Sequence, residues 1–237
     1  MKKIFSLLII SVFSLIIISS CGKEKKYAMV KVKNETDSVS YYIGLDFGTK
    51  LKQAKIDSVM NYNAFMKGVT EAVYGDTLPV STFEMQTYIN QYFMKFQEEQ
   101  IKREYKDFIS QNEEFMKENS KRDSVITLPS GLQYVVIREG QGVKPTRNDV
   151  VKVHYSGKLV DGTIFDSSYQ RNEPAEFPVG QVIPGWVEAL QLMTVGSKWR
   201  VFIPENLAYG SQPPRGSVIK PYATLIFDVE LLDIVKK

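Results

Sequence analysis

Apolar and polar positions follow three different patterns along the 237-residue chain. Residues 4–18 form a predominantly apolar run behind Lys2 and Lys3. From about residue 37 to residue 122, apolar residues recur every three or four positions, which is typical of amphipathic helices. From about residue 123 onward they alternate with polar residues, as in strands with one buried face. The sequence therefore predicts a targeting segment, a helical module and a sheet module.

The helical module is predicted to contain two short helices and one long helix. The first short helix follows Asp37, and the second covers residues 63–73. Ser81 and Glu84 then form a capping-box pattern, which marks a helix start. The stretch that follows contains no proline or glycine as far as about Asn119. At 1.5 Å per residue, one continuous helix here would be about 55 Å long.

The predicted long helix carries an aromatic and aliphatic stripe that two short helices are too small to cover. The members of the stripe are Met85, Tyr88, Ile89, Tyr92, Phe93, Phe96, Ile101, Tyr105, Phe108, Phe115 and Met116. A stripe of this size is too apolar to face water, and a second copy of the same segment would bury it across a two-fold interface. We therefore expect a homodimer formed through residues 37–119. A monomeric three-helix bundle with a protruding stalk is the alternative.

Residues 123–237 predict an antiparallel sheet packed on one short helix. The strand-like segments are LQYVVIREG, DVVKVHYSGKLV, TIFDSS, SKWRVFIP and ATLIFDVELLDI. Asp161-Gly162 is a typical hairpin turn between the second and the third. The stretch QVIPGWVEALQLM has the period of a short helix, with Trp186 and Met193 on its apolar face. The predicted fold class is therefore α+β, with an all-α module and its long helix preceding the sheet module.

Composition and charge exclude several classes of function. The chain has 30 Lys and Arg residues against 27 Asp and Glu residues, a balance too even for a nucleic-acid-binding surface. His154 is the single histidine and Cys21 the single cysteine, so neither a catalytic triad nor a zinc cluster can be assembled. No glycine-rich phosphate loop opens a helix. We therefore expect no metal, no cofactor and no covalent or acid–base catalysis.

The N-terminus has the features of an export signal. The apolar run is shorter than the ~20 residues of a membrane span, and the small residues of ISSCGK follow it, which indicates a signal peptide over residues 1–20. This stretch resembles a bacterial lipoprotein signal, in which Cys21 is lipidated and becomes the new N-terminus. An ordinary secretory signal with an incidental thiol is the alternative. We expect residues 21–36 to be a flexible linker, and the protein to be anchored in the cell envelope, at an outer membrane facing the periplasm or the cell surface.

Several motifs of the sheet module, in the same order, closely resemble an FKBP-type peptidyl-prolyl cis-trans isomerase domain. They are VHYSGKLVDGTIFDSSYQRNEPAEFPVGQVIPGW, MTVGSKWRVFIPENLAYG and ATLIFDVELLDI, and the match covers residues 128–235. Upstream, SYYIGLDFGTKL resembles the N-terminal region of the macrophage infectivity potentiator-like subgroup, whose members dimerise through a helical module. The resemblance implies a helical dimerisation domain over residues 37–122 and an isomerase domain over residues 123–237.

The resemblance also implies a binding site, in which the substrate's prolyl ring lies in an apolar cup. The implied catalytic residues are Tyr155, Phe165, Asp166, Trp186, Tyr209 and Phe227, and the implied substrate-binding residues are Arg171, Phe177, Val182, Ile183 and Ile219. Trp186 would be the floor of the cup, although the residues alone also allow it to be an ordinary core side chain. The Tyr209 hydroxyl and the Ile219 backbone N–H would donate to substrate carbonyls.

Two charged residues of the implied site have roles of their own. Asp166 would supply a buried carboxylate near the twisting amide, and Arg171 would pair with Asp166 or with Tyr155.

Two positions depart from other members of the family: Ala175 stands where some have a pocket-edge phenylalanine, and Lys220 stands where a second proline is common. These departures leave sensitivity to macrolide inhibitors open.

The implied function is that of a peptidyl-prolyl cis-trans isomerase (EC 5.2.1.8) that accelerates the folding of exported polypeptides, with chaperone-like holding of unfolded, proline-containing clients. A proline-peptide-binding module with little turnover is the first alternative. A purely structural or adhesive lipoprotein is the second, and it would be expected to have lost Phe165, Asp166, Trp186 or Tyr209, all of which are present.

The lipid anchor leads to a first prediction. Replacing Cys21 by serine removes the acceptor thiol, so the Cys21→Ser protein should leave the detergent phase when cells are extracted and phase-separated, whereas the wild-type protein should remain in it. Unchanged partitioning of the variant would contradict the lipid anchor.

Overall fold

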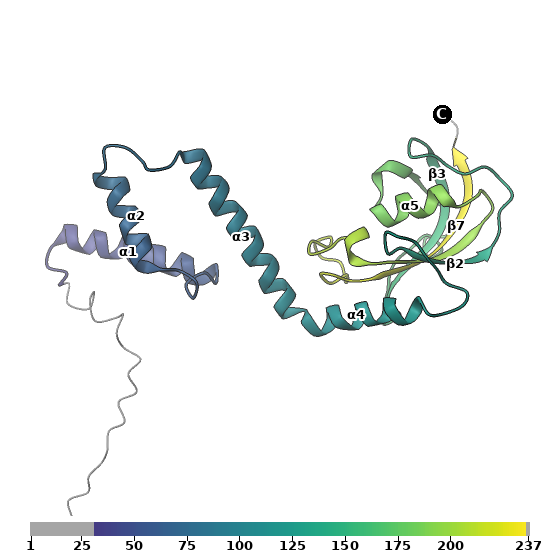
Figure 1. Cartoon of the computed structure of the whole chain (residues 1–237), viewed down its shortest axis with the longest axis horizontal. Helices are drawn as coiled ribbons and strands as arrows, with labels where there is room; N and C mark the ends of the chain where they lie inside the picture. The colour runs from purple at the N-terminus through teal and green to yellow at the C-terminus, as the bar shows by residue number, and fades with distance from the viewer. Residues whose placement is uncertain (1–30, 236–237) are drawn as a thin grey trace, which may run out of the picture. The chain divides into compact units, whose positions relative to one another are not determined.

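The computed structural model describes residues 31–235 (Figure 1). The predicted signal peptide and Cys21 lie outside the described residues. The chain divides between Pro79 and Val80 into two compact units, which are described separately below. Within residues 31–235, no helix combines the length and the apolar character needed to cross a membrane.

The first unit contains the two short helices that the sequence predicts. Helix α1 (Glu35–Gln53) starts at Glu35 and not after Asp37 as expected, because the side chain of Asn34 accepts a hydrogen bond from the Asp37 amide at 2.8 Å and caps the helix. Helix α2 (Tyr62–Tyr74) is capped by Asn61 in the same way. Polar side chains at both N-termini thus satisfy amides that the helices themselves leave unpaired.

The second unit begins with two helices where the sequence predicts one. Helix α3 (Thr82–Glu104) starts at the predicted capping box of Ser81 and Glu84, and helix α4 (Lys106–Asn119) follows after a break at Tyr105. The prediction of one continuous helix as far as Asn119 is therefore wrong. Helix α4 packs against the sheet, where Phe115 meets Phe202 with ring centroids 6.0 Å apart. We attribute the break to this tertiary contact, which outweighs the uninterrupted local helix propensity.

The rest of the second unit is an antiparallel sheet. Within the described residues its strands are β1 (Ile126–Thr127), β2 (Gln133–Arg138), β3 (Val150–Leu159), β4 (Ile164–Ser167), β5 (Ala175–Pro178), β6 (Lys198–Ile203) and β7 (Leu225–Val235). Their order is β1-β2-β6-β7-β3-β4, and β5 also pairs with β3. The predicted α+β class is confirmed. The short strands β1 and β5 were not predicted.

Strand β3 shares its outer edge between two partners. Strand β5 pairs with residues 150–153, and strand β4 pairs with residues 156–158. Between them, the buried side chain of Ser168 accepts a hydrogen bond from the Tyr155 amide at 2.7 Å, and the Ser168 amide donates to the Tyr155 carbonyl at 3.0 Å. Ser168 thus satisfies the backbone of Tyr155 at the point where neither strand does.

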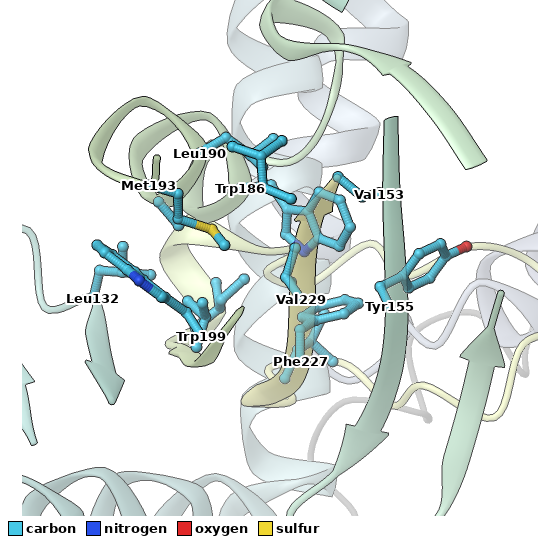
Figure 2. Close-up of a cluster of buried hydrophobic side chains, with 14 of the residues drawn as sticks. Leu132, Val153, Tyr155, Trp186, Leu190, Met193, Trp199, Phe227 and Val229 are labelled. Carbon is cyan, nitrogen blue, oxygen red and sulfur yellow. The ribbon is translucent and has the colours of Figure 1, made fainter. Parts of the chain in front are cut away.

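The core lies between the sheet and a single short helix, α5 (Pro184–Leu192), which crosses one face of the sheet (Figure 1). The 3-10 turn η1 (Val179–Gln181) precedes it, and η2 (Glu205–Leu207) follows β6. As the periodicity predicts, Trp186, Leu190 and Met193 are buried on the face toward the sheet. Figure 2 shows them grouped with Val153 and Val229. This packing fixes Trp186 between α5 and the two long central strands.

The opposite face of the sheet is covered by α4 at one end, where Phe202 is buried against Phe115, and carries polar side chains over the rest. Arg200 donates two hydrogen bonds to Asp228, at 2.6 and 2.9 Å, and Glu230 accepts one from Arg138 at 2.6 Å. His154 is on this face as well, stacked on Tyr169 with ring centroids 4.6 Å apart. The single histidine therefore lies on the face away from α5.

Candidate active site

A cavity of about 470 Å³ opens at one end of the core, between α5 and the sheet. It is lined by Tyr155, Phe165, Asp166, Phe177, Gln181, Val182, Ile183, Trp186, Tyr209, Pro214, Ser217, Ile219 and Phe227. All the residues of the site that the sequence implied are in this lining except Arg171. Gln181, Pro214 and Ser217 were not predicted as site residues. The segments from which they come were noted, but nothing in the sequence showed which of their side chains face inward.

Trp186 is at the centre of the cavity's aromatic lining. Its ring lies nearly perpendicular to those of Tyr155, Phe177 and Phe227, with centroid distances of 5.3, 5.6 and 5.2 Å. Edge-to-face contacts of this kind are favourable because the positive edge of one ring meets the negative face of another. Only 5% of Trp186 is exposed, and it packs in the core cluster as well. The ring is therefore both a core residue and part of the cavity lining.

Gly157 allows two aromatic walls to approach strand β3. Phe165 and Phe227 pack edge to face with centroids 5.4 Å apart. A Cβ atom at position 157 would lie 2.6 Å from Phe227 and 2.7 Å from Phe165, which is closer than real Cβ atoms come. The glycine thus lets both rings lie directly against the strand backbone.

A polar cluster closes one side of the cavity. The Tyr155 hydroxyl donates a short hydrogen bond to Asp166. Arg171 donates to Asp166 at 2.5 Å and to the Tyr155 oxygen at 2.9 Å. The sequence offered these two residues as alternative partners, and Arg171 pairs with both. The expectation of a buried Asp166 carboxylate is wrong, because 42% of its side chain is exposed at the cavity mouth.

The protonation states of this cluster are fixed by its contacts. The partial burial of Asp166 opposes its ionisation, but the hydrogen bonds from Tyr155 and Arg171 outweigh this effect and lower the pKa of the carboxyl. Burial, reinforced by Asp166, raises the pKa of Tyr155. Burial also raises the pKa of Tyr209. At neutral pH Asp166 is therefore a carboxylate, and both tyrosines keep their protons as hydrogen-bond donors.

The remaining wall comes from residues 209–224, which we call the rim segment. Tyr209, Pro214, Ser217 and Ile219 reach the cavity from it. The Ile219 amide, which was expected to face substrate, donates to the Ser217 hydroxyl at 3.3 Å. This bond is long, so a better acceptor in the cavity would compete with Ser217 for the same N–H.

Comparison with known proteins identifies the family. The model for FKBP-type peptidyl-prolyl cis-trans isomerases matches residues 141–232, and the model for the domain amino-terminal to them matches residues 36–136. The FKBP-type 22 kDa peptidyl-prolyl cis-trans isomerase of Escherichia coli is 42% identical over 196 residues, which cover 83% of this chain and 94% of the relative. The chain belongs to the FKBP-type peptidyl-prolyl cis-trans isomerase family. The resemblance seen in the sequence is thereby confirmed.

Two further matches extend along most of this FKBP-type isomerase. The outer membrane protein MIP of Legionella longbeachae is 40% identical over 209 residues, or 85% of this chain and 87% of the relative. The crystal structure of FkpA from Escherichia coli superposes with a TM-score of 0.54 and 32% identity, covering 86% of this chain and 98% of that one. The protein is thus a peptidyl-prolyl cis-trans isomerase, as predicted. The lipid anchor, the homodimer and the roles of single residues stay predictions.

The protonation states lead to a second prediction. Because the pKa of Asp166 is lowered and those of Tyr155 and Tyr209 are raised, none of these groups titrates between about pH 5 and about pH 9. The kcat/KM of this FKBP-type isomerase on a short proline peptide should therefore be constant over that range.

The measurement is a pH profile of peptide isomerisation, with a His154→Gln variant as the control for the single histidine. A bell-shaped profile for both proteins would indicate acid–base catalysis in the cavity and contradict the prediction.

Proposed function

We propose that the cavity over Trp186 holds the prolyl ring of an X–Pro bond while the preceding carbonyl rotates. The observation that carries this proposal is the set of aromatic rings standing perpendicular to the Trp186 indole in a cavity of about 470 Å³. Such an apolar cup suits a small saturated ring.

The energetic argument starts from the planar amide. Its C–N bond has partial double-bond character, which gives rotation a barrier of ~18–20 kcal/mol and an uncatalysed exchange time of roughly 10–100 s. Twisting the bond removes the resonance and leaves the carbonyl and the nitrogen less polarised than in the planar form. An apolar cup therefore favours the twisted amide over the planar one, and this difference in binding is what accelerates the reaction.

Each residue of the cavity lining has a role that depends on its position. Trp186 is the floor, and Tyr155, Phe165, Val182, Ile183 and Phe227 are the walls, with Phe177 supporting the floor. At the rim, the Tyr209 hydroxyl donates to a substrate carbonyl, and the Ile219 N–H does the same in place of its long contact with Ser217. These donors, aimed at the twisted geometry, add to differential binding.

The polar cluster of Tyr155, Asp166 and Arg171 holds the side chains at one side of the cavity in place and transfers no proton. Arg171 neutralises Asp166 through an ion pair and also holds the Tyr155 hydroxyl. The Asp166 carboxylate then faces the twisting amide with a fixed charge and position. This arrangement needs neither a base nor a metal.

The third prediction tests the cup. Trp186→Leu removes the floor and should abolish most of the acceleration, and Tyr209→Phe removes one donor and should lower kcat/KM about tenfold. Tyr134→Phe is the matched control, because Tyr134 is a partly buried tyrosine stacked on Trp199, outside the cavity lining. The measurement is cis-to-trans isomerisation of an Ala-Leu-Pro-Phe peptide by the full soluble chain.

Binding of the same peptide, followed by fluorescence, separates the enzyme from a holding module. If the wild-type protein binds the peptide but does not accelerate its isomerisation, the cavity is a binding site with little turnover. If Tyr209→Phe and Tyr134→Phe lose activity equally, the rim donor has no special role.

We also propose that the protein is a homodimer formed through residues 37–119, with chaperone-like holding of unfolded clients. Large apolar side chains are exposed on both the first and the second unit; the most exposed of them on α1 and α3 are Tyr42, Ile43, Phe83, Tyr88 and Met94, which are 64 to 80% exposed. Residues of this kind favour a partner. A dimer would bring two cavities to one client, so that holding and isomerisation act on the same chain.

The fourth prediction concerns this dimer. The double substitution Tyr88→Glu and Tyr92→Glu, at positions one helical turn apart on α3, should make the protein monomeric in light scattering, because the charges would be buried without partners in the dimer. In this variant the kcat/KM per chain on a short peptide should be unchanged. Its ability to suppress the aggregation of an unfolded client should fall. Gln97→Glu, an exposed polar position of the same helix, is the control and should remain dimeric. A dimer that survives the double substitution would contradict the proposal.

Finally, we propose that the mature protein is attached to the cell envelope through lipid on Cys21, with the segment between Cys21 and α1 as linker; the expected linker boundary at residue 36 is two residues too late, because α1 begins at Glu35. The signal-like N-terminus supports this location, and so does the name of the Legionella relative, an outer membrane protein. The Cys21→Ser experiment described above tests it.

A further inference from the structure

The rim segment is tied at its base. It leaves the fold after η2 and returns into β7, and the Tyr222 amide closes it by donating to the Gly210 carbonyl at 2.7 Å. Tyr222 has a φ of +60°, a left-handed conformation that is strained for a bulky residue. Such a conformation persists where its surroundings enforce it. The Gly210 bond is one constraint on this conformation, and contacts from outside the segment add to it.

Helix α4 supplies the main contact. The Thr224 amide, two residues after Tyr222, donates to the Asn112 side-chain oxygen at 2.8 Å. The Asn112 side-chain nitrogen in turn donates to the Phe108 carbonyl at 2.8 Å, which fixes the orientation of the amide. Thr224 and Asn112 are 3% and 4% exposed, so water does not replace either bond.

Two cation–π contacts lie beside this hydrogen bond. The Lys220 ammonium lies 5.2 Å from the centroid of the Phe108 ring, and the Lys102 ammonium, at the end of α3, lies 5.7 Å from the centroid of the Tyr222 ring. The returning arm of the rim segment is thus held against both helices. None of these helical residues lines the cavity.

We propose that Asn112 is a positioning residue for the isomerase: by holding the base of the rim segment, it sets where Tyr209 and Ile219 stand relative to Trp186. The inference rests on the proposed role of the cavity in binding the prolyl group. Asn112 touches no substrate and acts through the segment that does. Helix α4, which precedes the sheet in the chain, thus supports the rim segment of the binding site.

Asn119 is a matched control on the same helix. It is also 4% exposed. Its side-chain nitrogen donates to Gln133 at 2.8 Å and its oxygen accepts from Arg122 at 2.9 Å. It therefore ties α4 to β2 and makes none of these contacts with the rim segment. Asn112→Ala and Asn119→Ala each remove one buried, doubly bonded amide from α4, and they differ in what the amide held.

The fifth prediction compares these variants in the full soluble chain, at a temperature where denaturation curves show each of them folded. Asn112→Ala should lower kcat/KM on the proline peptide about tenfold relative to Asn119→Ala, the scale of one buried hydrogen bond, with most of the loss in KM. Asn112→Asp keeps an oxygen for the Thr224 amide, so its activity should return toward that of the wild type although its stability falls. If activity simply follows stability across the three variants, the proposal is wrong.

Hydrogen exchange gives a readout independent of activity. In Asn112→Ala the amides of Tyr222 and Thr224 should exchange about tenfold faster than in Asn119→Ala. Equal exchange in the two variants would overturn the positioning role, whatever the kinetics. Failure of the proposed function itself would look different: Trp186→Leu would keep full activity, while exchange would still report whether Asn112 holds the segment.

Discussion

The perpendicular packing of the Trp186 indole against Tyr155 and Phe227 is the contact on which the rest of the domain depends. It joins α5 to the two long central strands, β3 and β7, and so closes the hydrophobic core. The same ring forms part of the cavity lining. The largest side chain of this short helix thus packs the core and lines the cavity at once. The stability of the core and the shape of the cavity are therefore coupled at one residue.

The character of the cavity follows from what surrounds that ring. Aromatic and aliphatic side chains make up most of the lining, and the charge of Asp166 is balanced by Arg171 at the mouth. An isomerase that rotates an amide needs a surface that prefers a less polar, twisted bond, and it has no proton to move. The fixed protonation states of Asp166, Tyr155 and Tyr209 agree with this requirement, because they supply donors and one constant charge.

Much of this could be predicted from the sequence, and the failures have physical causes. The alternation in the strands, the Asp161-Gly162 turn and the helical face of Trp186 are local patterns, and the fold follows them. The break at Tyr105 has no local signal, since neither proline nor glycine is near, and it follows from the docking of α4 on the sheet. Gln181 and Ser217 face the cavity because of loop conformations that no periodicity describes. The exposure of the Asp166 side chain likewise depends on how much of the cavity mouth other segments of the chain cover, and no local pattern in the sequence describes that.

The way Ser168 completes the edge of β3 has a consequence for how the family can diversify. Because one serine satisfies the backbone of Tyr155 on both its amide and its carbonyl, the strand does not rely on residues 169–174 for its main-chain hydrogen bonds at this point. Those residues form a loop that connects β4 to β5, beside the hydrogen bonds between Ser168 and Tyr155. A change at Arg171, in this loop, would remove its hydrogen bonds to Asp166 and Tyr155 and so alter one side of the cavity, while the register of the central strand is left intact. The loop can therefore reshape the cavity mouth without disturbing the main-chain pairing of the strand beneath it.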